Sequence, residues 1–400
     1  MARTAAGLTI ADGQCLIDDG FVTETIAASP DGLAVAPEVA DDCVVDASGL
    51  LVLPGIVDIH GDAFERQIMP RPGVDFPIDV ALADSDRQAV ANGITTVFHG
   101  VTWSWEPGLR GPDNARRLLA AIERLRPTLS ADTRFHLRHE VFNLDAEATI
   151  VEWLSDKRID ILAFNDHMAA TAEGMTRKQS LARMVERSGV SREEFLRIAA
   201  RVRERRSEVP GSVARIAAAA EACGVPMLSH DDASPEQRLH YRALGCRVAE
   251  FPTTLETAQE AAAGGDAIVL GAPNVVRGGS HTGWTRASDM IAQGLCSVLA
   301  SDYYYPAQLL AAFRLAADGT LPLARAWALV SAAPAAAAGL LDRGRIAPGL
   351  RADLLLVDAT AQRPRLVATI AAGRIVHLVE ADRLMRAPAR HPARLQGALP

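Results

Sequence analysis

The chain has 400 residues, of which 49% are hydrophobic and 22% charged, and its formal net charge is -8. This length fits one large α/β barrel, alone or with a small accessory domain. The acidic balance argues against a nucleic-acid partner held by a broad basic surface, and no apolar run approaches the roughly 20 residues that a membrane span needs.

The N-terminus and the cysteines indicate a cytoplasmic protein. The first residues, MARTAAGLTIADG, contain no apolar signal-peptide core. The five cysteines are odd in number and include no Cys-x-x-Cys pair, so neither a disulfide framework nor a zinc ribbon is indicated. A reducing cytoplasm is the simplest location.

The two ends of the chain both read as short β-strands separated by turn residues. Residues 4–53 contain several such runs, divided by Asp-Gly and Ser-Gly pairs, and residues 345–378 contain a matching set. Pairing between the ends would cover strand edges that neither piece can cover alone. We therefore predict a composite β-sandwich domain from residues 1–53 and 345–400.

The middle of the chain, residues 54–344, alternates apolar runs with helical patterns. This alternation is typical of a parallel sheet, and about eight strands over this length predict a (β/α)₈ barrel. An open doubly wound sheet is the alternative, weakened by the absence of Gly-x-Gly-x-x-Gly after the first strand. The predicted strands cover residues 55–62, 94–100, 134–141, 160–167, 225–232, 247–254, 267–274 and 297–304.

Residues 177–206 interrupt this rhythm with a long charged helical stretch between the fourth and fifth strands. A solvated helix face is the simplest interpretation. A lid or a contact between identical subunits is the alternative, and this stretch is the one candidate for a homo-oligomer interface.

Polar residues gather at the carboxyl ends of the predicted strands, which share one rim in a parallel barrel. His60 and Asp62 leave the first strand on the same side, since side chains two apart share a face. Imidazoles and carboxylates at successive strand ends predict a divalent-metal site. Two ions need a bridging ligand, and one known bridge is a carbamylated lysine, which neither Lys157 nor Lys178 can easily supply. A carboxylate should therefore bridge, and Glu140 is the best placed. The other such residues are His99, Asn165, Asp166, His167, His230, Asp231, Asp232, Glu250, Asn274, Ser301 and Asp302.

A second feature is the glycine-rich segment GAPNVVRGGSHTGW, residues 271–284. Arg277 offers a planar fork suited to phosphate, and a Gly-Gly-Ser turn can form an anion nest. A plain glycine-rich barrel loop is the alternative. Arg66 and Arg71 are further anion candidates, and Tyr303 fits either packing or the lining of a substrate pocket.

Several motifs resemble the amidohydrolase superfamily, in particular its members that act in phosphonate metabolism. LPGIVDIHGD and IAPGLRADLLLVD are the usual first and last motifs of the superfamily. The motifs that resemble the phosphonate subgroup are RPGVDFP, NGITTVFHG, LSHDDAS, AEFPTTLE, GAPNVVRGGSHTGW and SDYYYP.

This resemblance implies a metal-dependent barrel hydrolase that cleaves pyrophosphate from α-D-ribose 1-methylphosphonate 5-triphosphate, a small phosphorylated substrate. One or two divalent ions are implied, with zinc expected and manganese or iron as alternatives. Asp302 would also be catalytic, taking a proton from the attacking water. The implied metal ligands are His60, Asp62, Glu140, His167, His230 and Asp302. The implied substrate-binding residues are Arg277, Asn274, Gly278, Gly279, His281, Arg71 and Tyr303.

Two other functions stay open at this stage. The chain has Gly-Asp-Ala-Phe-Glu after His60, where the phosphonate subgroup is expected to carry Thr-Asp-Asn-Leu-Glu, and such changes fall where substrate is chosen. The same metal site could serve a C–N hydrolase acting on a cyclic amide or an amino-heterocycle, because fold does not fix function. A binding protein without catalysis would hold no metal.

Overall fold

The computed structural model describes residues 7–37, 43–71, 73–279, 287–360 and 363–386. Its centre is an eight-stranded parallel barrel sheet, ordered β13-β12-β11-β10-β9-β8-β7-β6. Each strand corresponds to one of the eight apolar runs that the sequence predicts. The strands are β6 (Ile56–Gly61), β7 (Ile94–Trp103), β8 (Asp132–Glu140), β9 (Ile161–Asn165), β10 (Met227–His230), β11 (Val248–Glu250), β12 (Ala267–Gly271) and β13 (Val298–Ala300).

The barrel closes where its last strand meets its first. The Asp62 amide donates to the Asp302 carbonyl at 3.0 Å, and the Asp302 amide donates to the His60 carbonyl at 3.0 Å. The buried Asp58 carboxylate accepts from the Ser301 amide at 3.0 Å and from its hydroxyl at 2.6 Å. This seam excludes the open doubly wound alternative and places predicted site residues on both of its sides.

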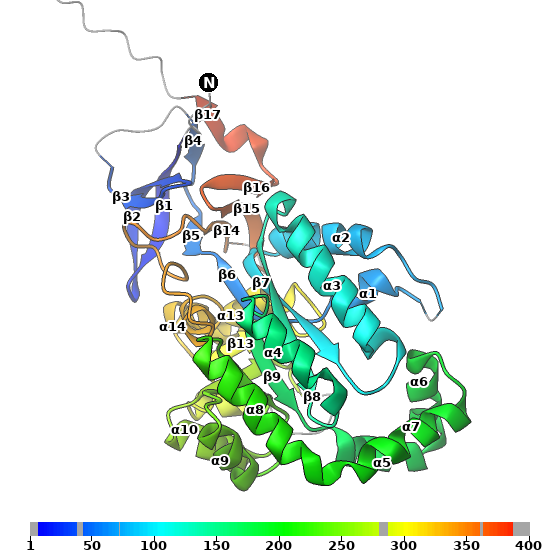
Figure 1. Cartoon of the computed structure of the whole chain (residues 1–400). Helices are drawn as coiled ribbons and strands as arrows, with labels where there is room; N and C mark the ends of the chain where they lie inside the picture. The colour runs from blue at the N-terminus through cyan, green and yellow to red at the C-terminus, as the bar shows by residue number, and fades with distance from the viewer. Residues whose placement is uncertain (1–6, 38–42, 72, 280–286, 361–362, 387–400) are drawn as a thin grey trace, which may run out of the picture.

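Helices surround the barrel on its outer side (Figure 1). No described helix combines the length and apolarity needed to cross a membrane. The helices are α1 (Glu65–Ile68), α2 (Ile78–Ala91), α3 (Pro112–Leu125), α4 (Glu147–Ser155), α5 (Met168–Thr176), α6 (Lys178–Ser188), α7 (Arg192–Glu204), α8 (Val209–Ala222), α9 (Pro235–Ala243), α10 (Leu255–Ala263), α11 (Ala272–Arg277), α12 (Ala287–Ala292), α13 (Ala307–Ala317), α14 (Leu323–Ala328) and α15 (Ala332–Ala337).

Strands from both chain ends form a separate nine-stranded sheet, in which blue and red strands lie together in Figure 1. The join is the antiparallel pairing of β5 with β14, in which Val52 faces Leu356. The fold class is thus confirmed, while the domain limits after residues 53 and 344 stay a prediction. The strands are β1 (Leu8–Ile17), β2 (Gly20–Ser29), β3 (Gly32–Val35), β4 (Cys43–Asp46), β5 (Leu51–Pro54), β14 (Leu354–Asp358), β15 (Arg365–Ala371), β16 (Arg374–Leu378) and β17 (Leu384–Arg386).

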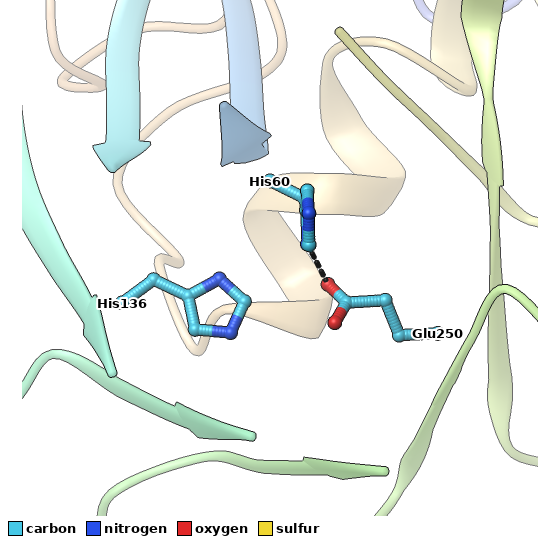
Figure 2. A group of neighbouring side chains, drawn as sticks. All are labelled: His60, His136 and Glu250. Atoms are coloured by element: carbon cyan, nitrogen blue, oxygen red, sulfur yellow. Dashed lines mark hydrogen bonds and ion pairs between the residues drawn. The ribbon is translucent and has the colours of Figure 1, made fainter. Parts of the chain in front are cut away.

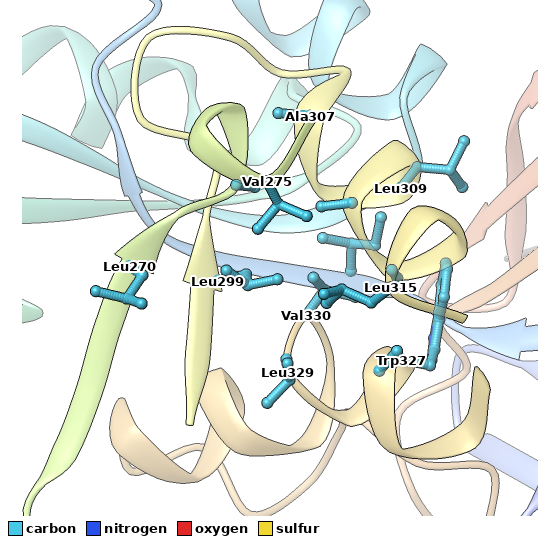
Figure 3. Close-up of a cluster of buried hydrophobic side chains, with 14 of the residues drawn as sticks. Leu270, Val275, Leu299, Ala307, Leu309, Leu315, Trp327, Leu329 and Val330 are labelled. Atoms are coloured by element: carbon cyan, nitrogen blue, oxygen red, sulfur yellow. The ribbon is translucent and has the colours of Figure 1, made fainter. Parts of the chain in front are cut away.

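A hydrophobic cluster ties the last barrel strands to the helices that follow them (Figure 3). Leu299 and Leu315 are buried there beside Trp327, which is fully buried. The Trp327 indole N–H donates to the Pro54 carbonyl at 3.0 Å, at the point where the chain passes from β5 into the barrel. Its polar atom is therefore satisfied while the ring fills the core.

The charged stretch at 177–206 is two helices rather than one. Gly189 ends α6 in the left-handed conformation, with φ 69°. Ser191 begins α7, where its side chain accepts a hydrogen bond from the Glu194 amide at 3.1 Å. A glycine stop followed by a serine cap explains the break.

Candidate metal centre

Three of the strands that build the rim end in left-handed turns. Asp231, Phe251 and Asp302 follow β10, β11 and β13 and have φ values of 58°, 56° and 55°. Non-glycine residues adopt this region at a cost of about 1–3 kcal/mol, and such strain is concentrated at functional sites. The turns carry two carboxylates to the rim beside the histidines.

Glu250 holds two of the predicted metal ligands in place. Its Oε1 atom lies 2.6 Å from Nδ1 of His60, and its Oε2 atom lies 2.7 Å from Nδ1 of His230. Figure 2 shows the His60 ring directed at Glu250, with His136 beside the pair. Burial alone would raise the pKa of Glu250, but the imidazoles of His60 and His136 hold it well below its usual value. An ionised carboxylate on each Nδ1 leaves each Nε2 as the nitrogen available to a metal.

The donors fall into two neighbouring groups that fit a divalent ion. One ligand atom each from His60, Asp62 and Asp302 lies within 4.8 Å of the others. His167, His230 and Asp231 form a second group by the same measure. The His60 and His230 rings stack at 5.4 Å between centroids, so the groups adjoin. Nitrogen and carboxylate oxygen donors at the C-terminal rim of a barrel suit Zn²⁺ and similar ions.

A third group of His60, His136 and Glu250 is fully buried in the barrel. The Nδ1 atom of His136 lies 2.9 Å from the Ile59 carbonyl, and burial lowers the pKa of His136 to about 3. The Nδ1 atom of His136 is thus bonded to the backbone, while its buried Nε2 atom has no hydrogen-bond partner among the described residues.

Glu140, the predicted bridging carboxylate, lies at the end of β8 beside His167. Its Oε1 atom is 2.6 Å from Nδ1 of His167, and Asp231 lies 3.1 Å from Nε2 of the same ring. Burial alone would lower the pKa of His167, but these two carboxylates raise it to about 9. Both nitrogens of His167 therefore face acids, and ligation of a metal would release a proton. A bridging role for Glu140 stays a prediction.

Arg138 is a buried cation inside the site that the sequence did not reveal as functional. Its Nη2 atom lies 2.9 Å from Nε2 of His230, and its Nη1 atom lies 3.7 Å from Asp62. Burial, together with the nearby Arg138 charge, lowers the pKa of His230. His230 is therefore neutral and presents to Arg138 the lone pair that a metal would use.

Asp302, the predicted catalytic residue, has the environment of a proton acceptor. Burial and the adjacent Asp62 carboxylate raise its pKa to about 6. A base with a pKa near the working pH can both accept and release a proton efficiently.

Asn274 lies near Asp302 across Gly271, and its role in substrate binding stays a prediction. A Cβ atom built on Gly271 would lie 3.4 Å from Oδ2 of Asp302 and 3.6 Å from Nδ2 of Asn274. Glycine at the end of β12 thus leaves room for both side chains.

The glycines that follow cap a helix rather than form a free anion nest. Residues 272–277 form α11, which ends at Gly278 with φ 77°. The amides of Gly278 and Gly279 donate to the carbonyls of Val275 and Asn274. Contact between these glycines and substrate stays a prediction.

The other predicted substrate-binding residues lie at two places. Exposed Arg277 lies 3.4 Å from the Tyr303 hydroxyl, and the Arg66 guanidinium lies 5.5 Å from the centre of the Tyr303 ring. Arg71 instead lines a cavity beside α1 and α6. His281 lies outside the described residues.

The charged insert is anchored to the same rim. Arg187 of α6 forms an ion pair with buried Glu106 at 2.7 Å. Phe195 of α7 is fully buried, with its ring 5.7 Å from that of Trp105. The insert is therefore packed against the segment that follows β7 and is only partly solvated.

Arg138 was missed by the sequence reasoning, although its pattern in the sequence could have revealed it. Arg138 lies between His136 and Glu140 at every second position of a buried strand, a place where an unpaired arginine is costly. Glu250 and Asp231 were visible as polar strand ends, but their partners lie on other strands.

Comparisons with known proteins agree with this geometry. The Amidohydrolase family model matches residues 51–379. A relative from Escherichia coli K12, named alpha-D-ribose 1-methylphosphonate 5-triphosphate diphosphatase, is 35% identical over 325 residues, which are 78% of this chain and 84% of that protein.

Two solved structures show the same fold at low identity. A dihydropyrimidinase from Brevibacillus agri NCHU1002 has a TM-score of 0.64 and 13% identity, with 93% of this chain and 95% of that chain covered. A beta-aspartyl dipeptidase from Fervidobacterium islandicum AW-1 has a TM-score of 0.61 and 18% identity, with 93% and 97% covered. The family predicted from the motifs is confirmed: the chain belongs to the amidohydrolase family and is a metal-dependent hydrolase.

Proposed function

We propose that the protein hydrolyses α-D-ribose 1-methylphosphonate 5-triphosphate and releases pyrophosphate. The observation that carries this choice is the 35% identity to the relative of that name across most of both chains. The site agrees with an anionic substrate, because Arg138 lies among the metal donors and Arg66 lies against the Tyr303 ring at the rim.

Two sets of residues are proposed to hold divalent metal. His60, Asp62 and Asp302 would hold one ion, and His167, His230 and Asp231 a second, with Glu140 positioned to orient or bridge. Zinc is proposed, with manganese or iron able to use the same donors. When bound, the metal acts as a Lewis acid that acidifies water and neutralises phosphate oxygens.

The chain's own residues supply the proton transfer and the positioning. The Asp302 carboxylate takes a proton from water as the water oxygen bonds to the phosphorus nearest the sugar. The P–O bond from that phosphorus to the next phosphate breaks, and pyrophosphate leaves with the bonding electrons. Glu250 keeps His60 and His230 in the required tautomer throughout.

The test is pyrophosphate release from the ribose methylphosphonate triphosphate by the purified, metal-loaded chain. Release is expected to disappear after chelation and to return when zinc is restored. Dihydrouracil and hydantoin serve as comparison substrates, since the rival proposal is hydrolysis of a cyclic amide. Turnover of these amides with no pyrophosphate release would overturn the proposed function.

A cytoplasmic location is also proposed, with support from five free cysteines. The proposed partner is a small phosphorylated molecule, with no nucleic acid and no membrane involved. Association of identical subunits through α6 and α7 remains a proposal, and sedimentation of the purified chain would test it.

A further inference from the structure

A cavity of about 1310 Å³ lies at the rim of the barrel, outside the residues assigned to metal. Its walls come from residues 68–78 after β6, residues 108–117 after β7, and residues 183–189 of the insert. All three segments follow the carboxyl ends of barrel strands, so the cavity opens on the face that carries the site. We call it the arginine pocket.

The arginine pocket is positively charged within an acidic protein. The acidic residues of its wall are fewer than its arginines, whereas the whole chain has a net charge of -8. The acids are Asp75, Asp113 and Glu186. The arginines are Arg71, Arg116, Arg117, Arg183 and Arg187.

Several of these guanidiniums have donors to spare. Within the described part of the chain, Arg71 and Arg183 have no ion-pair partner, and both are exposed. The Nε–H of Arg187 is buried without a hydrogen-bond acceptor among the described residues, although its Nη2 atom reaches Glu106. Among the described residues, Arg117 has one side-chain hydrogen bond, which its Nη2 atom donates to the Asn114 side-chain oxygen at 3.3 Å. An anion with many oxygens would satisfy donors that the protein leaves open.

Two helices add to the positive potential at this place. Pro77 and Ile78 at the start of α2 line the pocket, as does Asn114 in the first turn of α3. Neither helix has a side chain capping its N-terminus, and both are 14 residues long. Uncapped helix N-termini carry partial positive charge that favours phosphate.

The pocket is adjacent to the metal donors. The Glu65 amide donates to the Asp62 carbonyl at 3.0 Å, and the four-residue helix α1 that begins at Glu65 ends at Ile68, which lines the pocket. Asp62 belongs to a metal group, and Arg187 belongs to the pocket wall. One bound molecule could therefore reach from the metal donors into the pocket.

We propose that the arginine pocket binds the two terminal phosphates of the triphosphate and then the leaving pyrophosphate. This inference rests on the proposed function for its substrate. It assigns the phosphate end to the side of the rim formed by α1, α3 and α6, and not to Arg277 and the glycines after α11. The insert then acts as a wall of the substrate site.

Calorimetry tests the inference by measuring the binding of inorganic pyrophosphate to the full-length chain from which metal has been removed. Arg71→Gln combined with Arg183→Gln is expected to weaken binding at least about tenfold, since each substitution removes charge-assisted hydrogen bonds to a phosphate group. The matched control is Arg201→Gln with Arg325→Gln, which changes the net charge equally at exposed positions elsewhere and should shift binding less than about twofold.

A third variant, Arg277→Gln, separates the two sides of the rim. Its pyrophosphate affinity should stay near that of the wild type. Equal affinity of the pocket variant and the wild type, or no binding to the wild type, would overturn the inference. Failure of the proposed function looks different: no pyrophosphate would be released from the ribose triphosphate, while added pyrophosphate would still bind in the pocket.

Discussion

The guanidinium of Arg138 lies 2.9 Å from Nε2 of His230, the nitrogen that the Glu250 contact leaves available to a metal. A built-in cation and a metal ion therefore compete for one lone pair. Arg138 also faces Asp62 at 3.7 Å, so its charge balances the site when metal is absent.

Substituting Arg138→Met should tighten divalent-metal binding by about tenfold. The variant removes a charged hydrogen bond worth about 1.5–3 kcal/mol that metal would have to displace. Titration of the metal-free chain with cobalt(II), followed by its visible absorption, measures the effect. Arg134→Met on the same strand is the control, because Arg134 pairs with Asp132 and Asp160 instead. Identical titrations for Arg138→Met and the wild type would contradict the competition.

Glu250→Gln should weaken metal binding by about 10- to 100-fold. Glutamine has one acceptor oxygen, whereas Glu250 uses two, one for each histidine. One imidazole would lose its fixed tautomer, and its Nε2 would no longer be reliably free. Competition against a chelator measures the affinity, with exposed Glu256→Gln as control. An unchanged affinity would show that Glu250 is only a buried structural acid.

Asp302→Asn should lower kcat by at least about 100-fold, the range of a lost general base. Asparagine keeps the shape and removes the carboxylate that accepts the proton. Circular dichroism should be unchanged, because the backbone bonds of residue 302 at the barrel seam do not depend on its side chain. The exposed Asp318→Asn variant should release pyrophosphate at the wild-type rate. Turnover retained by Asp302→Asn would remove its assigned role.

His99→Phe should make folding less sensitive to acid. Burial lowers the pKa of His99 to about 4, below the ordinary value of 6.5. Because the unfolded chain binds the proton more readily than the folded chain, neutral His99 contributes fully to folding stability above pH 6.5. This contribution to stability is lost as the pH falls toward 4. Between pH 7 and pH 5 the wild type should lose about 2 kcal/mol more stability than the variant.

Urea unfolding at the two pH values measures this difference. Phenylalanine suits the site because His99 already packs edge-on against Phe64, at 4.9 Å between ring centroids. The control is His240→Asn, at an exposed histidine, which should keep the acid sensitivity of the wild type. Equal losses for His99→Phe and the wild type would show that His99 does not stay neutral in the fold.

Much of the fold was predictable because its signals are local. Each barrel strand is a short apolar run, and its polar end marks the rim. The break between α6 and α7 also has a local signal, because Gly189 ends one helix and Ser191 caps the next. The high charge of the whole stretch drew attention away from that signal. The pairing of strands from the two chain ends was predictable because the strands at each end would otherwise leave their edges uncovered.

The finer arrangement of the site depends on contacts between distant residues. Glu250 meets His60 across 190 positions, and no periodicity encodes that distance. Asp231 joins the metal donors because its backbone is in the left-handed conformation, with φ 58°. The sequence Asp-Asp does not show which of Asp231 and Asp232 adopts this conformation. Asp232 pairs with buried Arg238 instead, at 3.2 Å.

The pairing of β5 with β14 also sets the order in which the protein can mature during synthesis. Strand β5 emerges from the ribosome early, but the strand that covers its edge is translated near the end. Until then the edge beside Val52 is open to other nascent chains, and exposed edges promote aggregation. Stalled or truncated synthesis before Leu356 would therefore disturb a strand made long before it.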